Sequence, residues 1–287
     1  MYLPMVVGVD GSEASLKAVD WAADEAALHG VPLRIVHAYR WDRYEGAGLA
    51  RELGKPLARV TSDDILIVAT RRACRHHPDL AVTTEAVAEE PEYVLLREAR
   101  NASAVIVGTR GRGELADLLL GSVSLTVATA ADCPVIVIRG NHDNRAADGR
   151  HGRIVVGVAD APTAAVRFAC EEARRRGAAL GALRAWRCPT HDTADHPLLA
   201  GSAERLHEER AAKELEAALA DAPADVTLRR HTVEGPARRV LLTASSEADL
   251  LVVGRRRPGQ FGHRLGRVAH TVLHHAACPV AVVPDTA

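Results

Sequence analysis

Short runs of Val, Ile and Leu alternate along the chain with longer stretches whose apolar positions recur at helical spacing. In the first half, the apolar runs predict strands over Met5–Val9, Leu33–Tyr39, Ala81–Val87, Ala104–Gly108 and Pro134–Ile138. The stretches between them predict helices over Ser12–His29, Asp63–His77, Pro91–Ala102 and Ser122–Ala131. This alternation predicts right-handed βαβ units and a five-stranded parallel sheet covered by helices.

Local signals support the first of these helices. Ser12 has the short hydroxyl side chain preferred at an N-cap, and Gly30 has the freedom to adopt the left-handed conformation that ends many helices. Pro91 fits the first turn of its helix, where a missing N–H costs nothing. We therefore expect the helix near the N-terminus to span nearly all residues between Ser12 and Gly30.

The second half of the chain repeats the first. Matching segments occur in the same order: Val6–Asp10 with Val155–Ala159, Trp21–Ala26 with Phe168–Ala173, Ala104–Gly108 with Leu250–Gly254, and Ala131–Ile138 with Ala277–Val283. Residues 141–152 between the copies are polar and lack hydrophobic periodicity, which is typical of a linker. The sequence therefore predicts two tandem α/β domains, residues 1–140 and 153–287. The second copy has a longer, highly charged helix over Ser202–Ala222.

A glycine-spaced segment follows a buried strand of the first copy and precedes a helix. Its members are Gly108, Gly111, Gly121 and Ser122. Glycines allow backbone N–H groups to approach an anion, and the N-terminus of a helix favours negative charge. In parallel sheets, ligands bind at the carboxyl ends of the strands, where Asp10 also lies. The spacing therefore predicts a phosphate site in the first copy.

Composition and charge narrow the function. The chain has a formal net charge of -1 and only 3% aromatic residues, which disfavours a nucleic-acid partner. No apolar stretch reaches the length of a membrane span, and the N-terminal residues do not resemble a signal peptide. Five cysteines without paired spacing indicate a reducing environment, so we expect a cytoplasmic protein. Cys133 and Cys278, each before Pro-Val, are expected to be buried.

Catalytic and metal-binding motifs are missing from the sequence. It contains no G-x4-G-K-[ST], no H-E-x-x-H and no G-x-S-x-G segment, and the adjacent histidine pairs point to different helix faces. No pair of carboxylates accompanies the glycine segment. These observations favour a binding protein without metal ligands or catalytic residues, although slow nucleotide hydrolysis stays open.

The repeated order, the glycine spacing and Asp10 together resemble the universal stress protein family. Its ATP-binding members carry G-x2-G-x9-G-[ST] after the fourth strand, which Gly108, Gly111, Gly121 and Ser122 match. The resemblance implies two Rossmann-like domains of the adenine nucleotide alpha hydrolase-like type, with helices on both faces of each sheet. It also implies that ATP, with Mg²⁺, is bound by these residues: Gly8, Val9, Asp10, Ala38, Val107, Gly108, Gly111, Gly121, Ser122, Val123 and Ser124.

The second copy departs from this pattern. Ala159 replaces Asp10, Arg257 replaces Gly111, and Arg267 replaces Ser122. An arginine at the helix start fills space that phosphates would need, so we expect weak or no ATP binding by the second domain. Its arginines alternatively predict a pocket for another anion; they are Arg255, Arg256, Arg257, Arg264 and Arg267.

The family resemblance predicts a cytosolic regulatory module of the stress response that responds to ATP through an unknown protein partner. In this family the last strands of two domains commonly pair, so we expect a homodimer or an intramolecular pseudo-dimer. A slow ATPase or nucleotidyl-transferring enzyme, and a scaffold without nucleotide, are the alternatives. The sequence leaves open whether the nucleotide is ATP, ADP or a cyclic nucleotide.

Overall fold

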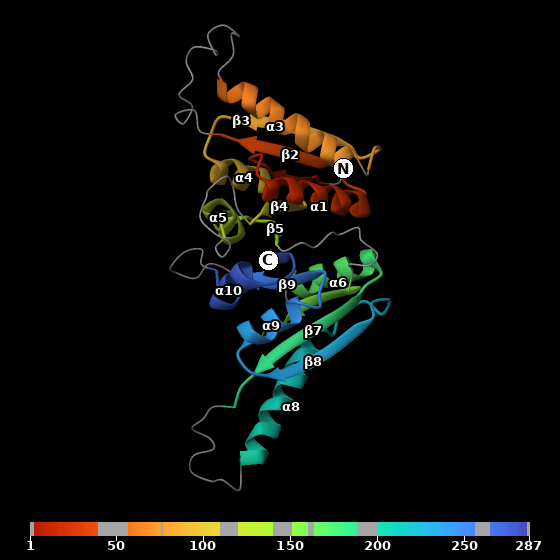
Figure 1. The fold of residues 1–287 in the computed structure, drawn as a ribbon. Helices are drawn as coiled ribbons and strands as arrows, with labels where there is room; N and C mark the ends of the chain where they lie inside the picture. Colours follow the sequence, from red (N-terminus) through yellow and green to blue (C-terminus); the bar gives the residue numbers. More distant parts are fainter. Residues whose placement is uncertain are drawn as a thin grey trace. The chain divides into compact units, whose positions relative to one another are not determined.

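The computed structural model describes residues 3–39, 57–75, 77–109, 120–139, 151–159, 164–188, 200–255 and 265–285. These residues form two units, with β1 to β5 in the first and β6 to β10 in the second (Figure 1). Within the described residues, no helix is both long and apolar enough to cross a membrane.

The first unit alternates strands and helices as the hydrophobic pattern predicts. Its strands are β1 (Met5–Gly8), β2 (Leu33–Ala38), β3 (Val82–Val87), β4 (Ala104–Gly108) and β5 (Val135–Ile138). Its helices are α1 (Glu13–His29), α3 (Leu57–Cys74), α4 (Pro91–Ala99) and α5 (Ser122–Ala130).

The second unit repeats this order. Its strands are β6 (Arg153–Gly157), β7 (Ala179–Trp186), β8 (Leu228–Glu234), β9 (Leu250–Arg255) and β10 (Val280–Pro284). Its helices are α6 (Ala164–Arg176), α8 (Ala200–Ala218), α9 (Ala237–Ser245) and α10 (Arg267–His275).

Each unit contains a five-stranded parallel sheet, which confirms the predicted fold class. The order is β3-β2-β1-β4-β5 in the first unit and β8-β7-β6-β9-β10 in the second. The chain winds outward from β1 to β3 and then crosses back to β4. The connection from β1 to β2 and the connection from β3 to β4 run in opposite directions along the sheet. Because such connections are right-handed, α1 and α4 cover opposite faces of the sheet. The strand order reverses between β1 and β4, which is where such sheets bind ligands.

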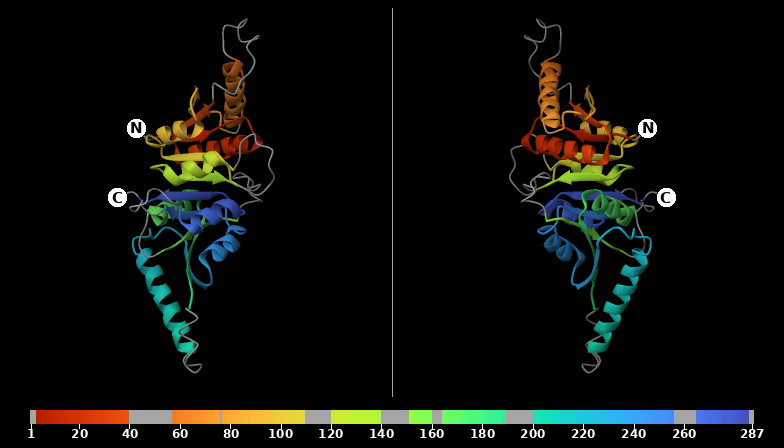
Figure 2. Two further views of the ribbon diagram at one scale, coloured as in Figure 1. Left: turned by 90° about the vertical axis from the view of Figure 1, so that its left-hand side faces the viewer. Right: turned by 90° about the vertical axis from the view of Figure 1, so that its right-hand side faces the viewer.

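Helix packing follows from this winding. In the first unit α1 packs against α3, and α4 packs against α5. In the second unit α9 packs against α10, while α8, drawn in cyan in Figure 2, packs against β7 and β8. Strands β4 and β5 are buried along their whole length, and the Trp21 side chain of α1 lies in the core. Burial of these aliphatic side chains is the main favourable contribution to the free energy of folding.

The helix signals are confirmed for α1 and need correction for α3. Ser12 is the N-cap of α1, and its side chain accepts a hydrogen bond from the Ser15 N–H; Gly30 ends the helix with φ 64°. Helix α3 begins at Leu57 rather than Asp63 and ends at Cys74 rather than His77. Acidic residues favour a first turn, but α3 has none in its first turn, and Ser62, directly before Asp63, is fully buried within the helix.

Candidate functional site

The first unit has a cavity of about 150 Å³ at the carboxyl ends of β1, β2 and β4, beside the start of α5. It is lined by Gly8, Val9, Asp10, Ser15, Val36, Ala38, Pro91, Leu95, Val107, Gly108, Val123 and Ser124. Eight of the eleven residues predicted to bind nucleotide are in this set. The cavity therefore lies at the point where the strand order reverses.

Two further predicted residues lie at the start of α5. Gly121 is the N-cap residue, and Ser122 is the first residue of the helix. The Gly121 N–H donates to the Thr109 carbonyl oxygen at 2.7 Å, which joins the helix start to the end of β4. Gly111 is outside the described residues. Among the described residues no side chain caps α5, and the first N–H groups of this helix have no intrahelical acceptor.

Asp10 is held by a tight turn between β1 and α1. Its Oδ1 accepts hydrogen bonds from the Ser12 N–H at 3.0 Å and from the Ser12 hydroxyl at 2.6 Å. The Ser12 hydroxyl oxygen in turn accepts from the Ser15 N–H at 3.2 Å. Both bonds to Asp10 go to Oδ1, and within the described chain Oδ2 has no such bond. One carboxylate oxygen is therefore oriented by the protein while the other can accept from a ligand.

Close packing between α1 and β4 explains why Gly108 follows the strand. A Cβ on Gly108 would lie 2.7 Å from the Ala14 carbonyl oxygen and 2.8 Å from the Ala14 carbonyl carbon. The Ser124 hydroxyl donates to the Gly108 carbonyl oxygen at 2.7 Å, so this hydroxyl is already used within the protein. The backbone N–H groups of α5 are consequently the main donors that the helix start offers to an anion.

Sequence reasoning missed part of the cavity wall. Pro91 and Leu95 come from α4, and the Leu95 side chain would lie 3.0 Å from a Cβ on Gly8. The buried His37 Nδ1 lies 2.7 Å from the Val9 carbonyl oxygen, which requires a proton on Nδ1 because a carbonyl oxygen only accepts. The apolar positions of α4 were the sequence signal for this part of the wall. Which of them lie against β1 is visible only in the folded structure.

The second unit has a larger cavity at the equivalent strand ends, of about 570 Å³. Its walls include the strand-end residues Gly157, Val158, Ala159, Leu183, Arg184, Ala185, Val253 and Gly254, the α9 residues Ala237, Val240 and Leu241, and Gly266, Arg267, Val268, Ala269 and Asp285. This volume is in the range of about 300–1,000 Å³ typical of small-molecule sites, whereas the cavity of the first unit is smaller. The unit with the degenerate motif thus has a roomier cavity.

Charged side chains are arranged differently around this second cavity. Arg184 donates to the Ala159 carbonyl oxygen and to the Glu214 carboxylate. The Asp285 Oδ1 accepts from the Ala164 N–H at 3.2 Å, at the start of α6. The Asp285 carboxylate, directly after β10, therefore contacts the N-terminus of α6. At the position that corresponds to Asp10, this cavity has Ala159. Of the arginines predicted there, Arg267 lines the cavity and the buried Arg255 is the last residue of β9; Arg256, Arg257 and Arg264 are outside the described residues.

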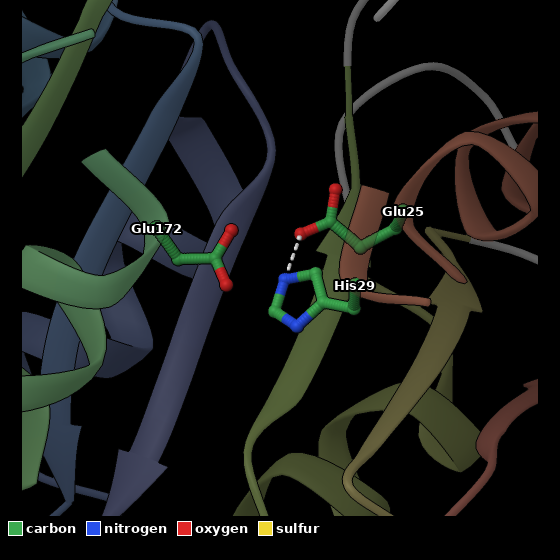
Figure 3. A group of neighbouring side chains, drawn as sticks. All are labelled: Glu25, His29 and Glu172. Carbon is green, nitrogen blue, oxygen red and sulfur yellow. Dashed lines mark ion pairs between the residues drawn. The ribbon is translucent and has the colours of Figure 1, made fainter. Parts of the chain in front are cut away.

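Each unit also has a buried glutamate in its first helix, away from the cavity-lining residues. Glu25 of α1 pairs with His29 one turn later, with an Oε1–Nε2 distance of 3.3 Å (Figure 3). Glu172 of α6 pairs with Arg176, with an Oε2–Nε distance of 3.3 Å. A cation one turn after a glutamate stabilises a helix, as Arg176 does for Glu172; His29 adds a charge only when its imidazole is protonated. We assign these pairs a structural role in their own helices.

Comparison with known proteins agrees with the duplicated fold. The model of the universal stress protein family matches twice, over residues 1–139 and 151–284. Universal stress protein Rv2005c of Mycobacterium tuberculosis is 34% identical over 299 residues, covering 97% of this chain and 96% of the relative. A universal stress protein of Mycolicibacterium smegmatis is 32% identical over 289 residues, with 97% and 96% covered.

A solved structure is similar over the whole length. The crystal structure of a universal stress protein from Archaeoglobus fulgidus has a TM-score of 0.68 and 17% identity, and the match covers 99% of this chain and 98% of that chain. At this identity the similarity concerns the fold alone. With two matches to the family model and relatives above 30% identity along nearly the full length, the chain belongs to the universal stress protein family.

Proposed function

We propose that this protein is an ATP-binding regulatory protein whose nucleotide site is the cavity of the first unit. The observation that carries the proposal is that one cavity is lined by Asp10, by Gly108 of the glycine-spaced segment, and by Val123 and Ser124 in the first turn of α5. A carboxylate that can accept from a hydroxyl and a helix N-terminus that favours phosphate then lie beside the same strand ends.

The geometry suggests a role for each part of the site. The Oδ2 of Asp10 accepts from a ribose hydroxyl, because Oδ1 is already bonded to Ser12. Val9, Ala38 and Val107 surround the nucleoside, and the N–H groups at the start of α5 bind the phosphates. The role of Gly111 in phosphate binding rests on the sequence motif alone. Mg²⁺ would be held mainly by the phosphates, since hard cations prefer oxygen ligands and keep several waters.

The cavity volume constrains this proposal. At about 150 Å³ it is below the range of roughly 300–1,000 Å³ seen for small-molecule sites, so it can enclose only part of ATP. We infer that the nucleoside occupies the cavity and that the phosphates extend along the start of α5. This arrangement predicts that contacts to the adenosine determine which base is bound. It also predicts that the phosphates bind more weakly as the salt concentration rises.

A regulatory role is favoured over an enzymatic one by the lining of the site. Asp10 is the only ionisable side chain among the described residues that line the cavity. Its carboxylate is engaged in the turn at the start of α1, and no histidine or second carboxylate among those residues could act as a partner in acid–base catalysis. Nucleotide binding that favours one conformation or assembly, such as a homodimer, is the function that this chemistry supports.

Thermal unfolding with and without Mg-ATP tests the proposal. At about 100 times its dissociation constant, ATP should stabilise the protein by roughly 2.7 kcal/mol. Asp10→Asn keeps an oxygen for the Ser12 N–H but loses the charge, and should reduce the ATP-induced shift while leaving the unliganded protein nearly as stable. Asp79→Asn is the control, since it removes one exposed charge away from the cavity. Equal shifts in the two variants would contradict the assigned role of Asp10.

The two alternatives make different predictions. A slow ATPase releases phosphate over many turnovers, and Asp10→Ala abolishes that release. A scaffold without a nucleotide site shows no ATP-dependent change in melting temperature in any variant. We expect tight binding with no multiple-turnover phosphate release.

A further inference from the structure

The outer face of α3 has two exposed aliphatic side chains next to each other. Ile67 is 47% exposed and Val68 is 48% exposed. Helix α3 packs on α1, β2 and β3 at one edge of the first sheet (Figure 1), and its opposite face supplies buried side chains such as Leu66 and Ala69. Single exposed apolar residues are normal on protein surfaces, whereas adjoining ones are typical of interaction surfaces.

Local helix preference does not explain these two residues. Ile and Val are β-branched and stabilise a helix less than Leu, Glu or Ala. The equivalent helix of the second unit, α8, has buried residues at the same spacing as α3: Ser62, Leu66 and Ala69 in α3, and Ala211, Leu215 and Ala218 in α8. In this register the exposed Glu216 corresponds to Ile67, and the exposed Ala217 follows it. The first unit therefore has an apolar surface where the second unit does not.

Two opposite charges flank the apolar pair at equal distances along the helix. Asp64 lies three residues before Ile67, and Arg71 lies three residues after Val68. Both charged side chains are exposed, and neither forms an ion pair or a side-chain hydrogen bond with another described residue. Residues at i, i+3, i+4 and i+7 share one face of a helix, so the two charges and the apolar pair form one stripe.

This stripe is complementary to itself. When a second copy of α3 lies antiparallel across it, with a twofold axis between Ile67 and Val68, each Ile67 faces a Val68 of the other copy. Each Asp64 then faces an Arg71 of the other copy, because the two charges are equally far from the axis. In a parallel pair of helices, like charges would face each other. The charges therefore select the antiparallel arrangement.

We propose that the outer face of α3, formed by Asp64, Ile67, Val68 and Arg71, is a surface through which two copies of this chain associate, helix against antiparallel helix. This face lies at the β3 edge of its sheet, whereas the last strand, β5, forms the other edge. None of its residues lines the cavity of the first unit, so the proposal does not depend on nucleotide binding. Because the apolar area is small, the association is weak and reversible.

Sedimentation velocity of the nucleotide-stripped full chain, between about 5 and 500 µM, tests this proposal in the concentration range where weak dimers form. We expect the sedimentation coefficient to rise with concentration. Ile67→Glu combined with Val68→Ala gives α3 the exposed residues of α8. It should weaken association about 100-fold or more, because each change occurs twice in the dimer. Leu206→Glu is the matched control: it removes a 66% exposed leucine from α8 and should leave association unchanged.

Charge reversal tests the antiparallel register. Asp64→Arg and Arg71→Asp should each weaken association about tenfold or more, since each places like charges opposite each other at two positions of the dimer. The two reversals combined restore opposite charges, so the affinity should return to within about threefold of that of the original protein. Thermal unfolding checks that every variant is folded.

Three results would overturn the proposal. The first is a protein that stays monomeric over the whole concentration range. The second is a variant at Ile67 and Val68 that associates as strongly as Leu206→Glu. The third is a combined charge reversal that associates no more strongly than its single reversals. Absence of ATP binding would contradict the proposed function but leave this result standing.

Discussion

Replacing Gly108 by alanine should damage both the fold and the nucleotide site of the first unit. The new Cβ would lie 2.7 Å from the Ala14 carbonyl oxygen and 3.1 Å from the Ser15 nitrogen, both in the backbone of α1. Carbon–oxygen contacts of this kind are normally about 3.3–3.6 Å long, so α1 must retreat by roughly 0.6–0.9 Å. Overpacking of this size typically costs about 1–3 kcal/mol of unfolding free energy.

The retreat of α1 would also displace the turn that orients Asp10. Losing the one hydrogen bond that the Asp10 carboxylate accepts from the ligand should weaken ATP binding about 10- to 100-fold. Scanning calorimetry measures the stability change, which should lower the melting temperature of the first unit by roughly 2–10 °C. Titration with Mg-ATP on the same samples measures the affinity.

Gly254 in the second unit is a matched control at the equivalent strand end. A Cβ there would meet only the Ala165 Cβ at 3.6 Å, an ordinary contact, and neither glycine has a positive φ. Gly254→Ala should therefore be neutral or stabilising by about 0.4–1 kcal/mol, through the entropy of the unfolded chain. If Gly108→Ala proved as stable as Gly254→Ala, the close approach of α1 to β4 would be refuted as the reason for the glycine.

Three further predictions concern capping, cysteine reactivity and pH. Ser12→Ala removes the N-cap of α1 and should lower the unfolding free energy by about 0.5–2 kcal/mol in urea titrations; no change would contradict the capping role. Burial raises the pKa of the Cys278 thiol to about 12, so mass spectrometry after alkylation at pH 8 should find native protein modified at the two partly exposed cysteines; the protected ones are Cys133, Cys170 and Cys278. A hydrogen bond from Arg210 holds the pKa of Glu214 below its usual value, so this pair stabilises the fold above that value and the stabilisation is lost as the pH falls through the lower folded-state pKa. Glu214→Gln should flatten this acid limb, and an unchanged pH profile of stability would refute the linkage.

The fold was largely predictable from the sequence because each strand is a short apolar run and each unit repeats the other. Helix ends were less predictable where packing decides them. Asp63 looks like part of a first turn, yet α3 begins at Leu57, and the fully buried Ser62 lies inside the helix. The longer helix of the second copy was expected at Ser202 and begins at Ala200. Local preference alone does not set a helix end, because tertiary context can override it.

The site was predictable where its residues belong to a sequence motif or directly follow a predicted strand. Asp10 follows β1 and Gly108 ends β4, two strands that the topology brings together, so their meeting at the first cavity could be expected. Pro91 and Leu95 could not be assigned, because the face that α4 presents depends on its packing against β1. Asp285 was missed for a similar reason: it follows the last strand, and only the fold places its carboxylate at the start of α6.

The stoichiometry of Mg-ATP binding, measured by calorimetric titration of the nucleotide-stripped full chain, tests the central claim most directly. The account predicts one ATP per chain, lost in Asp10→Ala and in Ser122→Arg, the change that gives the first unit the helix start of the second. Two ATP per chain would show that the cavity beside Arg267 accepts the triphosphate after all. No binding would contradict the proposed nucleotide site in the first unit.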